Sequence, residues 1–365
     1  FMTKLSPIKL TPAYKDYIWG GTKLKTMYNK HSALDIVAES WELSAHKDGE
    51  SIVADGPYSG LTLTQYLNAI GNSALGTNAK NFDYFPILIK LIDARSALSV
   101  QVHPDDSYAL EHEGEYGKTE MWYILDCEEN ASLYYGFKKD VTKEEYKNAI
   151  ENNTLTDILN KIPVHKGDVF FIPAGTVHAI GAGILICEIQ QNSNTTYRVY
   201  DYNRRDKKGN TRPLHVEKAI AVSNLSKAPE IQQESDESNA ILAQCEYFTV
   251  REITVADTAS IDLDTTSFRS LIVTEGSAKL EINHETLSLE KGNSIFFPAT
   301  WYRGAAVLGV PLKTPSRPLQ ASRFTRLLRS LQTQALPPPC KSAGCAARRV
   351  WFCSRILLDV LPTSG

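Results

Sequence analysis

Two stretches of the chain repeat one pattern, and this repeat restricts the fold more than any other feature of the sequence. KGDVFFIPAGTVHAIGAG (166–183) aligns with KGNSIFFPATWYRGAAVLG (291–309), and in each copy five residues separate a glycine from a proline. Glycine permits the turn that opens a strand, and proline ends strand pairing at a corner. Because a repeated unit implies a repeated substructure, we expect two related β-barrel domains.

The two copies differ at one position that matters for chemistry. His178 follows the corner proline in the first copy, and Arg303 stands at the same offset in the second. Imidazole is a common metal ligand, whereas a guanidinium has no free lone pair to offer. The difference predicts a metal site in the first barrel and none in the second.

Short strand-like runs separated by turn residues fill most of the remaining chain, which indicates a fold dominated by β-structure. Helical patterns or capping signals interrupt these runs, and the helices are expected as insertions that cover the barrels. The predicted helices are 60–71, one that starts at the capping box of Thr142 and Glu145, 156–162, and 214–223. The predicted domains are 1–225, with the metal site, and 226–303, a degenerate copy without one.

Composition excludes several classes of protein. A formal net charge of −3 over 365 residues gives no sign of a nucleic-acid partner. The sequence shows neither a secretory h-region at its start nor an apolar run long enough to cross a membrane. Its six cysteines lack CxxC spacing and are typical of reduced thiols in a cytoplasmic protein.

The segment 304–365 differs from the rest of the chain. Arginine replaces lysine as the main cation, Asp359 is its only acidic residue, and no strand or helix period is visible. The second repeat should end with one or two more strands, and the sequence offers none. We interpret the segment as a disordered or non-native tail; a genuine arginine-rich interaction tail is the alternative.

Four residues are candidate metal ligands: one lies in the first copy of the repeat and three precede it. The stretch LSVQVHPDD (98–106) puts Gln101 and His103 on one face of an extended strand. Glu120 opens the next strand, and His178 follows the proline corner. Two imidazoles, one carboxylate and one amide oxygen could hold a divalent metal ion and leave a coordination position open.

These motifs carry a resemblance to a known family. The spacing GxxxxxPxGxxH that ends at His178 is similar to the second cupin motif. QVHPDD, GKTEMW, PAGTVHAIGAG and EIQQNSNTTYRVYD, in this order, resemble the zinc-dependent type I mannose-6-phosphate isomerases, most closely the short bacterial form. The resemblance extends over roughly residues 5–303.

The resemblance implies two cupin (jelly-roll) barrels and one Zn²⁺ per chain, bound by Gln101, His103, Glu120 and His178. It also implies a cytoplasmic enzyme, a monomer or weak homodimer, that interconverts mannose 6-phosphate and fructose 6-phosphate. Because a mixed nitrogen and oxygen ligand set also accepts iron, manganese or cobalt, the metal itself stays open.

Aldose–ketose isomerisation moves a proton between C2 and C1 through an enediolate, so the site needs a base and charges that stabilise the developing oxyanion. Lys118 lies two residues before Glu120, on the same strand face, and is one candidate for the proton transfer. Longer relatives carry a histidine where Gly117 stands, which leaves the identity of the base open. Glu188 is the competing base, or else a residue that orients a ligand histidine. Arg198 suits an enediolate oxygen or the phosphate, and a structural ion pair with Asp201 is the alternative.

Four further residues are candidates for binding the substrate. Lys90 lies in the apolar run ILIKLID, where a charged side chain is costly unless it reaches a cavity, a partner or the surface. The family resemblance places Lys90 and Ser99 at the sugar-phosphate site. Trp19 and Glu42 could line its mouth, although packing is the favoured explanation for Trp19.

Two other functions fit a cupin with these residues. A metal-dependent dioxygenase typically has more histidines in its first motif than Gln101 and His103 provide. A non-catalytic sugar-binding regulator should lack Lys118 and Arg198, which this chain has. The isomerase is therefore the favoured interpretation.

Overall fold

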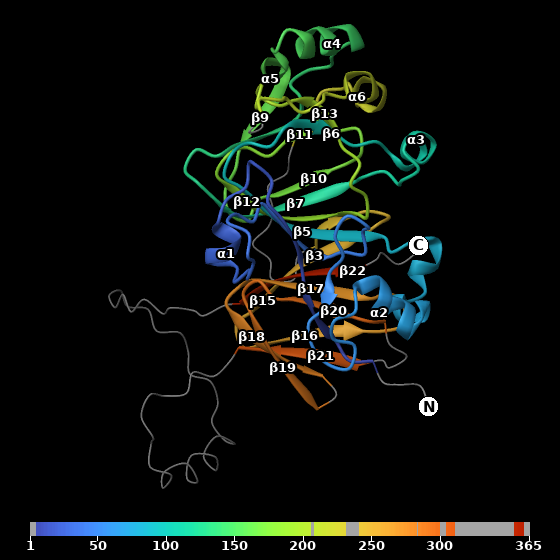
Figure 1. Cartoon of the computed structure of the whole chain (residues 1–365). Helices are drawn as coiled ribbons and strands as arrows, with labels where there is room; N and C mark the ends of the chain where they lie inside the picture. Colours follow the sequence, from blue (N-terminus) through green and yellow to red (C-terminus); the bar gives the residue numbers. More distant parts are fainter. Residues whose placement is uncertain are drawn as a thin grey trace, which may run out of the picture.

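Antiparallel pairing dominates the computed structural model, which describes residues 5–205, 208–230, 241–282, 284–299, 304–310 and 354–360. The strands form four sheets that lie one above another along the long axis of the molecule (Figure 1). Short helices cover the sheet at one end. The fold is therefore mostly β, as the sequence predicted.

Two sheets are built from the first part of the chain. The six-stranded sheet has the order β10 (Val169–Ile172), β7 (Glu120–Cys127), β12 (Ile184–Gln191), β5 (Ile87–Ala94), β3 (Glu39–Leu43), β2 (Ala13–Lys15). The five-stranded sheet has the order β13 (Tyr197–Tyr200), β6 (Val100–Val102), β11 (His178–Ala179), β8 (Ser132–Phe137), β9 (Leu159–Pro163).

The other two sheets come mainly from the second part of the chain. The seven-stranded sheet has the order β14 (Ile241–Gln244), β15 (Thr249–Val255), β22 (Ser354–Val360), β17 (Arg269–Glu275), β20 (Ser294–Phe297), β1 (Ile8–Thr11), β4 (Ile52–Val53). The four-stranded sheet has the order β16 (Thr258–Leu263), β21 (Gly304–Gly309), β18 (Ser277–Ile282), β19 (Glu285–Glu290).

The helices are short and lie outside the sheets. Their bounds are α1 (Lys23–Met27), α2 (Leu63–Ile70), α3 (Asp106–His112), α4 (Lys143–Glu151), α5 (Leu155–Ile158) and α6 (Val216–Val222). Two short 3₁₀ helices follow α2, at Asn72–Leu75 and Asn78–Asn81. Helices α4 to α6 gather at the far end of the five-stranded sheet (Figure 1).

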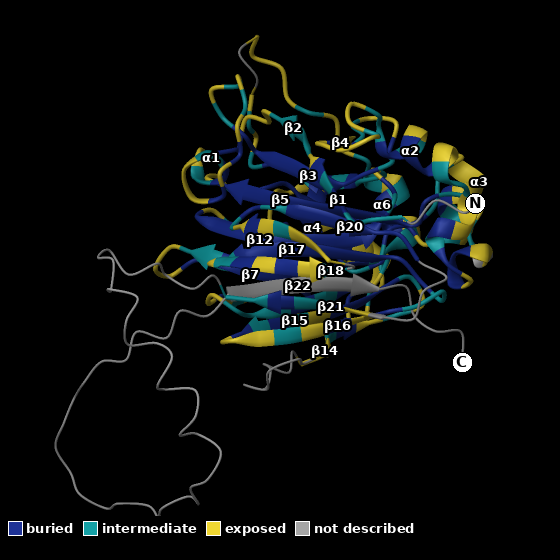
Figure 2. Cartoon of the chain, turned by 90° about the horizontal axis from the view of Figure 1, so that it is seen from below, coloured by how far each residue is buried: buried dark blue, intermediate teal, exposed yellow. Residues whose placement is uncertain are grey.

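Alternation along each strand separates the apolar layers. On β5, Ile89 and Leu91 face the seven-stranded sheet and share a core with its Phe296, while Ile92 belongs to the core on the opposite face. The α4–α6 layer packs on the outer face of the five-stranded sheet, where Val102 meets Tyr146 and other side chains. The central strands are accordingly buried and the surface positions lie on the helices and sheet edges (Figure 2).

The space between the five- and six-stranded sheets holds the polar residues. Val100 and Val102 of β6 face the helix layer, so Gln101 between them points the other way, toward the six-stranded sheet. Lys90 alternates with Ile89 and Leu91 and so points into the same space. The shared face of the motif QVH is therefore an interior between two sheets and not a wet surface.

Most predicted elements in this part are confirmed. Strand β7 matches the predicted strand 120–127, and helices α2 and α6 lie within 60–71 and 214–223. Thr142 caps α4 through a complete capping box with Glu145. The helix predicted at 156–162 is confirmed only in its first half, because α5 ends at Ile158 and the following residues pair with β8 as β9. Sheet pairing outweighs local helical preference in so short a segment.

The expectation of disorder in the tail is wrong for two segments, and its non-native origin stays a prediction. Residues 304–309 form β21, which pairs with β16, and residues 354–360 form β22 between β15 and β17. Open sheet edges bind any extended segment through backbone hydrogen bonds, which do not require a particular side-chain pattern. The rest of the tail and Arg303 lie outside the described residues.

The predicted domain limit at residue 225 stays a prediction. Strands β1 and β4, from the first 60 residues, lie in the seven-stranded sheet, where β1 pairs with β20. For brevity, the five- and six-stranded sheets with their helices are called the first region, and the seven- and four-stranded sheets the second region. Within the described residues, no helix has the length and apolar character that spanning a bilayer requires.

Candidate metal centre and active site

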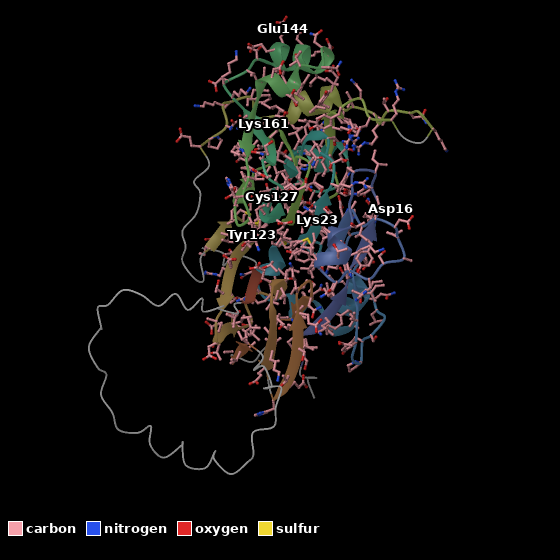
Figure 3. All side chains as sticks on the ribbon, turned by 90° about the vertical axis from the view of Figure 1, so that its left-hand side faces the viewer. Asp16, Lys23, Tyr123, Cys127, Glu144 and Lys161 are labelled. Atoms are coloured by element: carbon pink, nitrogen blue, oxygen red, sulfur yellow. The ribbon has the colours of Figure 1, made fainter. Side chains whose placement is uncertain are left out.

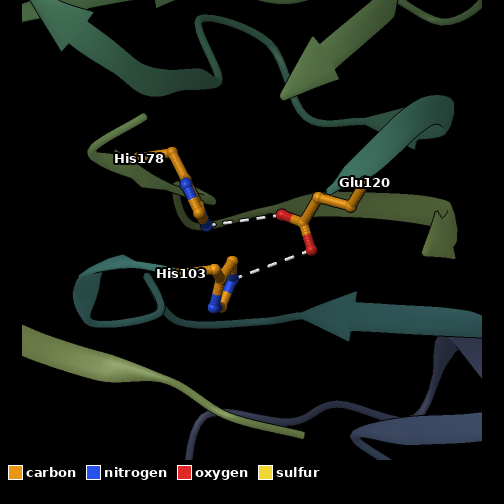
Figure 4. A group of neighbouring side chains, drawn as sticks. All are labelled: His103, Glu120 and His178. Atoms are coloured by element: carbon orange, nitrogen blue, oxygen red, sulfur yellow. Dashed lines mark ion pairs between the residues drawn. The ribbon is translucent and has the colours of Figure 1, made fainter. Parts of the chain in front are cut away.

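Three side chains from three strands or strand ends converge between the sheets of the first region (Figure 4). His103 follows β6, Glu120 opens β7, and His178 opens β11. Their ligating atoms all lie within 4.8 Å of one another, and all three residues are buried. In the part of the chain that is described, this is the only such group of histidine, cysteine or acidic residues.

Strand register explains why residues far apart in sequence meet here. In the five-stranded sheet, β6 lies between β13 and β11, so that Gln101 pairs with Arg198 on one side and His178 on the other. Side chains of paired residues in neighbouring strands point to the same face. Three of the residues singled out in the sequence therefore form a row across one sheet.

The donor atoms of this centre fit a metal ion. His103 Nε2 is buried and has no hydrogen-bond partner, and both carboxylate oxygens of Glu120 are buried, with Lys118 Nζ 2.8 Å from Oε2. Buried polar atoms are almost always paired, so an unpaired imidazole nitrogen beside a buried carboxylate fits a metal ion. Glu120 lies 3.3 Å from His178 Nε2 and 3.7 Å from His103 Nε2.

The two imidazoles are neutral and oriented, as metal ligation requires. Burial lowers the pKa of His178 to about 4, and burial together with Lys118 and His178 holds the pKa of His103 well below its usual range. The Nδ1 atoms of His103 and His178 lie 2.9 and 2.8 Å from the carbonyl oxygens of Thr195 and Thr176. With Nδ1–H donated to these carbonyls, each Nε2 keeps a free lone pair.

Gln101 lies at the edge of the same centre. Its amide Nε2 is 3.4 Å from His178 Nε2. The two ends of a glutamine amide are nearly equal in shape, so a half-turn presents the oxygen at the same place. The amide is thus positioned to supply an oxygen ligand.

A chain of buried ion pairs runs from the centre across the six-stranded sheet. Lys118 Nζ lies 2.8 Å from Glu120 Oε2 and 3.7 Å from Glu188 Oε1. Lys90 Nζ lies 3.2 Å from the same Glu188 oxygen and 4.0 Å from Glu39 Oε2. Charges therefore alternate along the row, which is how a low-dielectric interior can hold several of them.

Burial and these pairs set the pKa values of the carboxyl groups in opposite directions. Burial, together with the charge of Glu188, raises the pKa of Glu120 to about 7. Burial would also raise the pKa of Glu188, but Lys118 and Lys90 outweigh it and lower that pKa to about 2. Burial alone would lower the pKa of Lys90, but the charges of Glu188 and Glu39 outweigh burial and raise that pKa above its usual value. Lys90 and Glu188 are therefore fully ionised at neutral pH.

Two indole groups complete the row. Trp122 Nε1 donates to Glu188 Oε2 at 2.9 Å, and Trp41 Nε1 donates to Glu39 Oε2 at 2.7 Å. The Lys90 ammonium also lies 5.1 Å from the centre of the Trp41 ring. These contacts hold the Glu188 and Glu39 carboxylates and the Lys90 ammonium in place.

Arg198 joins the site from the five-stranded sheet. Its Nε donates to Ser99 Oγ at 3.2 Å, and its Nη1 donates to the carbonyl of Pro213 at 3.2 Å. Asp201, the alternative partner considered for this arginine, instead forms hydrogen bonds with Arg204 and Arg212. No carboxylate among the described residues forms an ion pair with Arg198, which leaves its charge available to an anion.

The structure brings together most of the residues singled out in the sequence, with two exceptions. Trp19 is buried in the apolar core beside Ala94 and Leu98. Glu42 points to the opposite face of β3, where it pairs with Lys30 at 2.7 Å and accepts a hydrogen bond from Ser40 at 2.6 Å. Neither contacts the ion-pair row.

Glu39 is the site residue that the sequence reasoning missed. It lies two residues before Trp41 and three before Glu42, in the strand ESWEL. Alternation places Glu39 and Trp41 on one face and Glu42 on the other. Lys90 pairs with Trp41 across the sheet, so the residues of this strand that share a face with Trp41 also share a face with Lys90. This pairing register is the signal that could have identified Glu39.

Gly117 has a backbone reason to be glycine. A Cβ atom built there would lie 2.3 Å from the carbonyl carbon of Asp105 and 2.7 Å from the carbonyl oxygen of Pro104. No side chain, including the histidine of longer relatives, fits at this point. The segment before Glu120 therefore packs directly on the segment after His103.

The fold and the site together define a class: a β-sheet protein with a buried two-histidine, one-carboxylate centre next to paired lysines and glutamates. Such a site combines candidate Lewis-acid and proton-transfer groups in one dry interior. Comparisons with known proteins identify the family within this class.

Residues 8–126 match the family model described as phosphomannose isomerase type I, catalytic domain, and residues 238–303 match mannose-6-phosphate isomerase, cupin domain. The chain is 38% identical over 298 residues to the mannose-6-phosphate isomerase of Streptococcus mutans, an alignment that covers 80% of this chain and 93% of that protein. It is also 38% identical over 302 residues, with the same coverage, to the mannose-6-phosphate isomerase ManA of Bacillus subtilis.

A crystal structure of mannose 6-phosphate isomerase from Bacillus subtilis superimposes with a TM-score of 0.77 at 34% identity, and covers 97% of this chain and 99% of that one. The fold extends to a phosphomannose isomerase from Salmonella typhimurium, with a TM-score of 0.72 at 15% identity. The chain belongs to the type I mannose-6-phosphate isomerases, a family of aldose–ketose isomerases.

Proposed function

We propose that this chain interconverts mannose 6-phosphate and fructose 6-phosphate with one Zn²⁺ ion bound by Gln101, His103, Glu120 and His178. The observation that carries the proposal is the buried donor set of the centre, in which His103 Nε2 has no partner, next to the ion-pair row. When bound, a divalent metal ion supplies Lewis-acid stabilisation of the negative charge that develops on the enediolate oxygens.

The charge balance of the site supports a sugar phosphate as substrate. Glu39, Glu120 and Glu188 face only two lysines in the row, so the row alone has an excess of negative charge. A divalent ion would make the net charge of the site positive, and Arg198 would make it more positive. A doubly charged phosphate ester is then the complementary ligand.

Lys118 is the proposed group that carries the proton between C2 and C1. It is buried, it lies beside the metal centre, and its ammonium contacts both Glu120 and Glu188. Glu188 is a poor base with a pKa of about 2, because a useful general base has a pKa nearer to the working pH. We therefore assign Glu188 the role of holding Lys118 and Lys90 in place.

Arg198, Ser99 and Lys90 are the proposed anion-binding groups. The Arg198 guanidinium is held in one orientation by Ser99 and the Pro213 carbonyl, and a fixed guanidinium binds phosphate or oxyanion oxygens with defined geometry. Lys90 stays charged because Glu188 and Glu39 flank it. Trp19 and Glu42 have no part in this proposal.

The finer description of the fold and setting is also a proposal. The five- and six-stranded sheets would correspond to one cupin barrel and the seven- and four-stranded sheets to a second barrel without metal. We propose a cytoplasmic enzyme that acts as a monomer or weak homodimer and binds no nucleic acid, consistent with its near-neutral charge and free thiols.

A coupled assay on mannose 6-phosphate tests the function directly. The zinc-replete protein should turn over the substrate, lose activity with a chelator, and regain it when zinc is returned. Absence of turnover in a folded, zinc-replete sample would contradict the proposal. Metal analysis of the same sample tests the stoichiometry of one zinc ion per chain.

A further inference from the structure

Asp106 accepts three hydrogen bonds from three separate parts of the chain. Its Oδ1 accepts from the backbone N–H of Gly117 at 2.8 Å and from Gln191 Nε2 at 2.9 Å. Its Oδ2 accepts from the hydroxyl of Tyr247 at 3.0 Å. Asp106 is not a residue of the metal centre or the ion-pair row, so these contacts need a separate explanation.

Gln191 transmits the position of Asp106 to β7. The Gln191 Oε1 accepts from Thr119 N–H at 2.7 Å, and the Gln191 backbone N–H donates to the Thr119 carbonyl at 3.1 Å. Thr119 lies between Lys118 and Glu120. Gln191 is 1% exposed, so these hydrogen bonds are shielded from water.

The other end of the same segment is fixed as well. Lys118 N–H donates to the Pro104 carbonyl at 3.0 Å, and Gly117 packs without any room for a side chain on the backbone of residues 104–106. Asp106 thus binds Gly117 on one side of Lys118 directly and Thr119 on the other side through Gln191. The proposed metal ligand Glu120 begins the strand immediately afterwards.

Tyr247 brings the second region into this arrangement. It lies between β14 and β15 of the seven-stranded sheet, while Asp106 belongs to the first region. The Tyr247 ring also packs against Phe82, with ring centroids 6.4 Å apart. The metal-free region therefore donates a hydrogen bond to the residue that fixes the Lys118–Glu120 segment.

We propose that Asp106 is a positioning residue for Lys118 and Glu120, and that Tyr247 makes this positioning depend on the second region. The second region then contributes to the chemistry without contacting the substrate. The inference rests on the proposed function, because Lys118 and Glu120 have their roles only within it. The experiment that tests this inference measures zinc affinity first, because zinc binding can be measured without turnover.

The experiment compares variants of the full chain. Asp106→Ala removes all three acceptor contacts, and Tyr247→Phe removes only the hydroxyl from the second region. Tyr123→Phe is the matched control: Tyr123 donates to Glu252 at 2.8 Å, again a phenol from one region on a carboxylate of the other. Figure 3 labels Tyr123 where β7 faces the second region.

Zinc affinity is measured by competition with a chromophoric chelator, with zinc as the only ligand. Loss of a group that orients a metal ligand typically weakens metal binding about 10–100-fold, so we expect about tenfold for Asp106→Ala and about threefold for Tyr247→Phe, which acts at one further remove. Tyr123→Phe should bind zinc like the unchanged protein.

Rescue separates positioning from general stability. Asp106→Asn keeps an acceptor for Gly117 and Gln191, and its amide can donate to the Tyr247 oxygen, so we expect zinc affinity close to that of the unchanged protein. At saturating zinc, Asp106→Ala should lower kcat with little change in KM, since Lys118 and Glu120 act in the transition state.

Two results would overturn the inference. Unchanged zinc affinity in Tyr247→Phe would remove the dependence on the second region, and equal losses in Tyr247→Phe and Tyr123→Phe would reduce the contact to ordinary stabilisation. If Asp106→Ala does not fold, the zinc affinities of Asp106→Asn and the two phenylalanine variants still test the inference. Zinc affinities that follow the prediction in a protein without turnover would contradict the proposed function alone.

Discussion

Both regions have an apolar core between their sheets, but only the first region also holds a buried metal centre and a row of charged side chains. Between the five- and six-stranded sheets lie His103, Glu120 and the charged row that starts at Lys118. Between the seven- and four-stranded sheets the facing side chains are apolar and include Leu271, Leu280 and others of one continuous core. The two interiors therefore differ in the metal-binding residues and the charged row, which only the first contains among the described residues.

The repeat shows where the two regions agree and where they diverge. In the first copy Phe170 and Ile172 of β10 enter an apolar core, and the proline corner then leads to β11, which presents His178 to the metal centre. In the second copy β20 corresponds to β10, and its Ile295 and Phe297 enter an apolar core in the same way. A strand framework fixes direction and spacing, and the inward residues decide the chemistry.

Breaking the metal centre should have the largest effect. His178→Ala removes a proposed ligand, so zinc should be absent from the purified protein. Because the metal is expected to supply several kcal/mol of transition-state stabilisation, activity should fall by about a thousandfold or more. Metal analysis with the coupled assay checks both, and Gln101→Ala should also lose zinc. Full zinc content in both variants would refute the ligand set.

Glu188→Leu tests whether the first interior tolerates conversion to the apolar type. The change removes the carboxylate that Lys90 and Lys118 share, and removing one partner of a buried ion pair costs about 3–5 kcal/mol of unfolding free energy. Urea unfolding with matched zinc content measures it. Glu188→Gln keeps the side-chain volume and can still accept the hydrogen bond from Trp122. An equally large loss of unfolding free energy in Glu188→Gln would show that the loss comes from removing the negative charge alone.

The same size of stability loss in the second region should leave the site intact. Leu280 is fully buried in the apolar core, and Leu280→Ala should lower the unfolding free energy by about 2–5 kcal/mol. Zinc affinity and kcat of the folded fraction should stay unchanged. A proportional loss of zinc affinity would show that the two interiors are coupled through stability and would weaken the distinction between them.

Arg198→Lys should have a moderate effect that is confined to the substrate. Lysine keeps the charge but cannot reproduce the oriented guanidinium that Ser99 holds. Loss of one hydrogen bond to a charged ligand costs about 1.5–3 kcal/mol, which predicts a KM for mannose 6-phosphate that is about tenfold higher or more. Zinc content should not change, and steady-state kinetics with metal analysis separate the two.

The sequence predicted the parts of the molecule that depend on local signals or on spaced motifs. Thr142 and Glu145 mark α4 because a capping box is a local interaction. The ligand candidates could be found because alternation fixes which residues share a face, and the motif order supplied the rest. Strand β9 was missed because its pairing with β8 is not local.

Glu39 and Glu42 show most clearly what could not be predicted from the sequence. Both are buried acidic residues of one short strand, and only the position of β3 in its sheet decides which one faces Lys90. Likewise, nothing in the sequence links Asp106 to Tyr247, which lie 141 residues apart and meet only when the two regions pack together. Contacts between sheets are set by the whole fold and are not encoded in any one segment.

The smallest predicted effect concerns the pH dependence of stability, which should arise in the first region. Within the described residues, the buried histidines are His46, His103 and His178, all in that region. Burial lowers the pKa of His46 below its ordinary value of 6.5, although Asp48 and Glu115 oppose the shift. A lowered folded-state pKa contributes stability that is fully present above 6.5 and is lost as the pH falls toward the folded value, since the unfolded chain then binds the proton more readily.

His46→Gln should therefore reduce the fall in urea midpoint between pH 7.5 and pH 5.5, with both proteins kept free of zinc. His165→Gln is the control, because His165 is exposed and its side chain makes no hydrogen bond that is described. An identical pH profile for His46→Gln and the unchanged protein would show that the acid sensitivity does not come from this buried imidazole. Were the profile to change as much with His165→Gln, burial would not be the cause, and the electrostatic contrast between the two regions would fail with it.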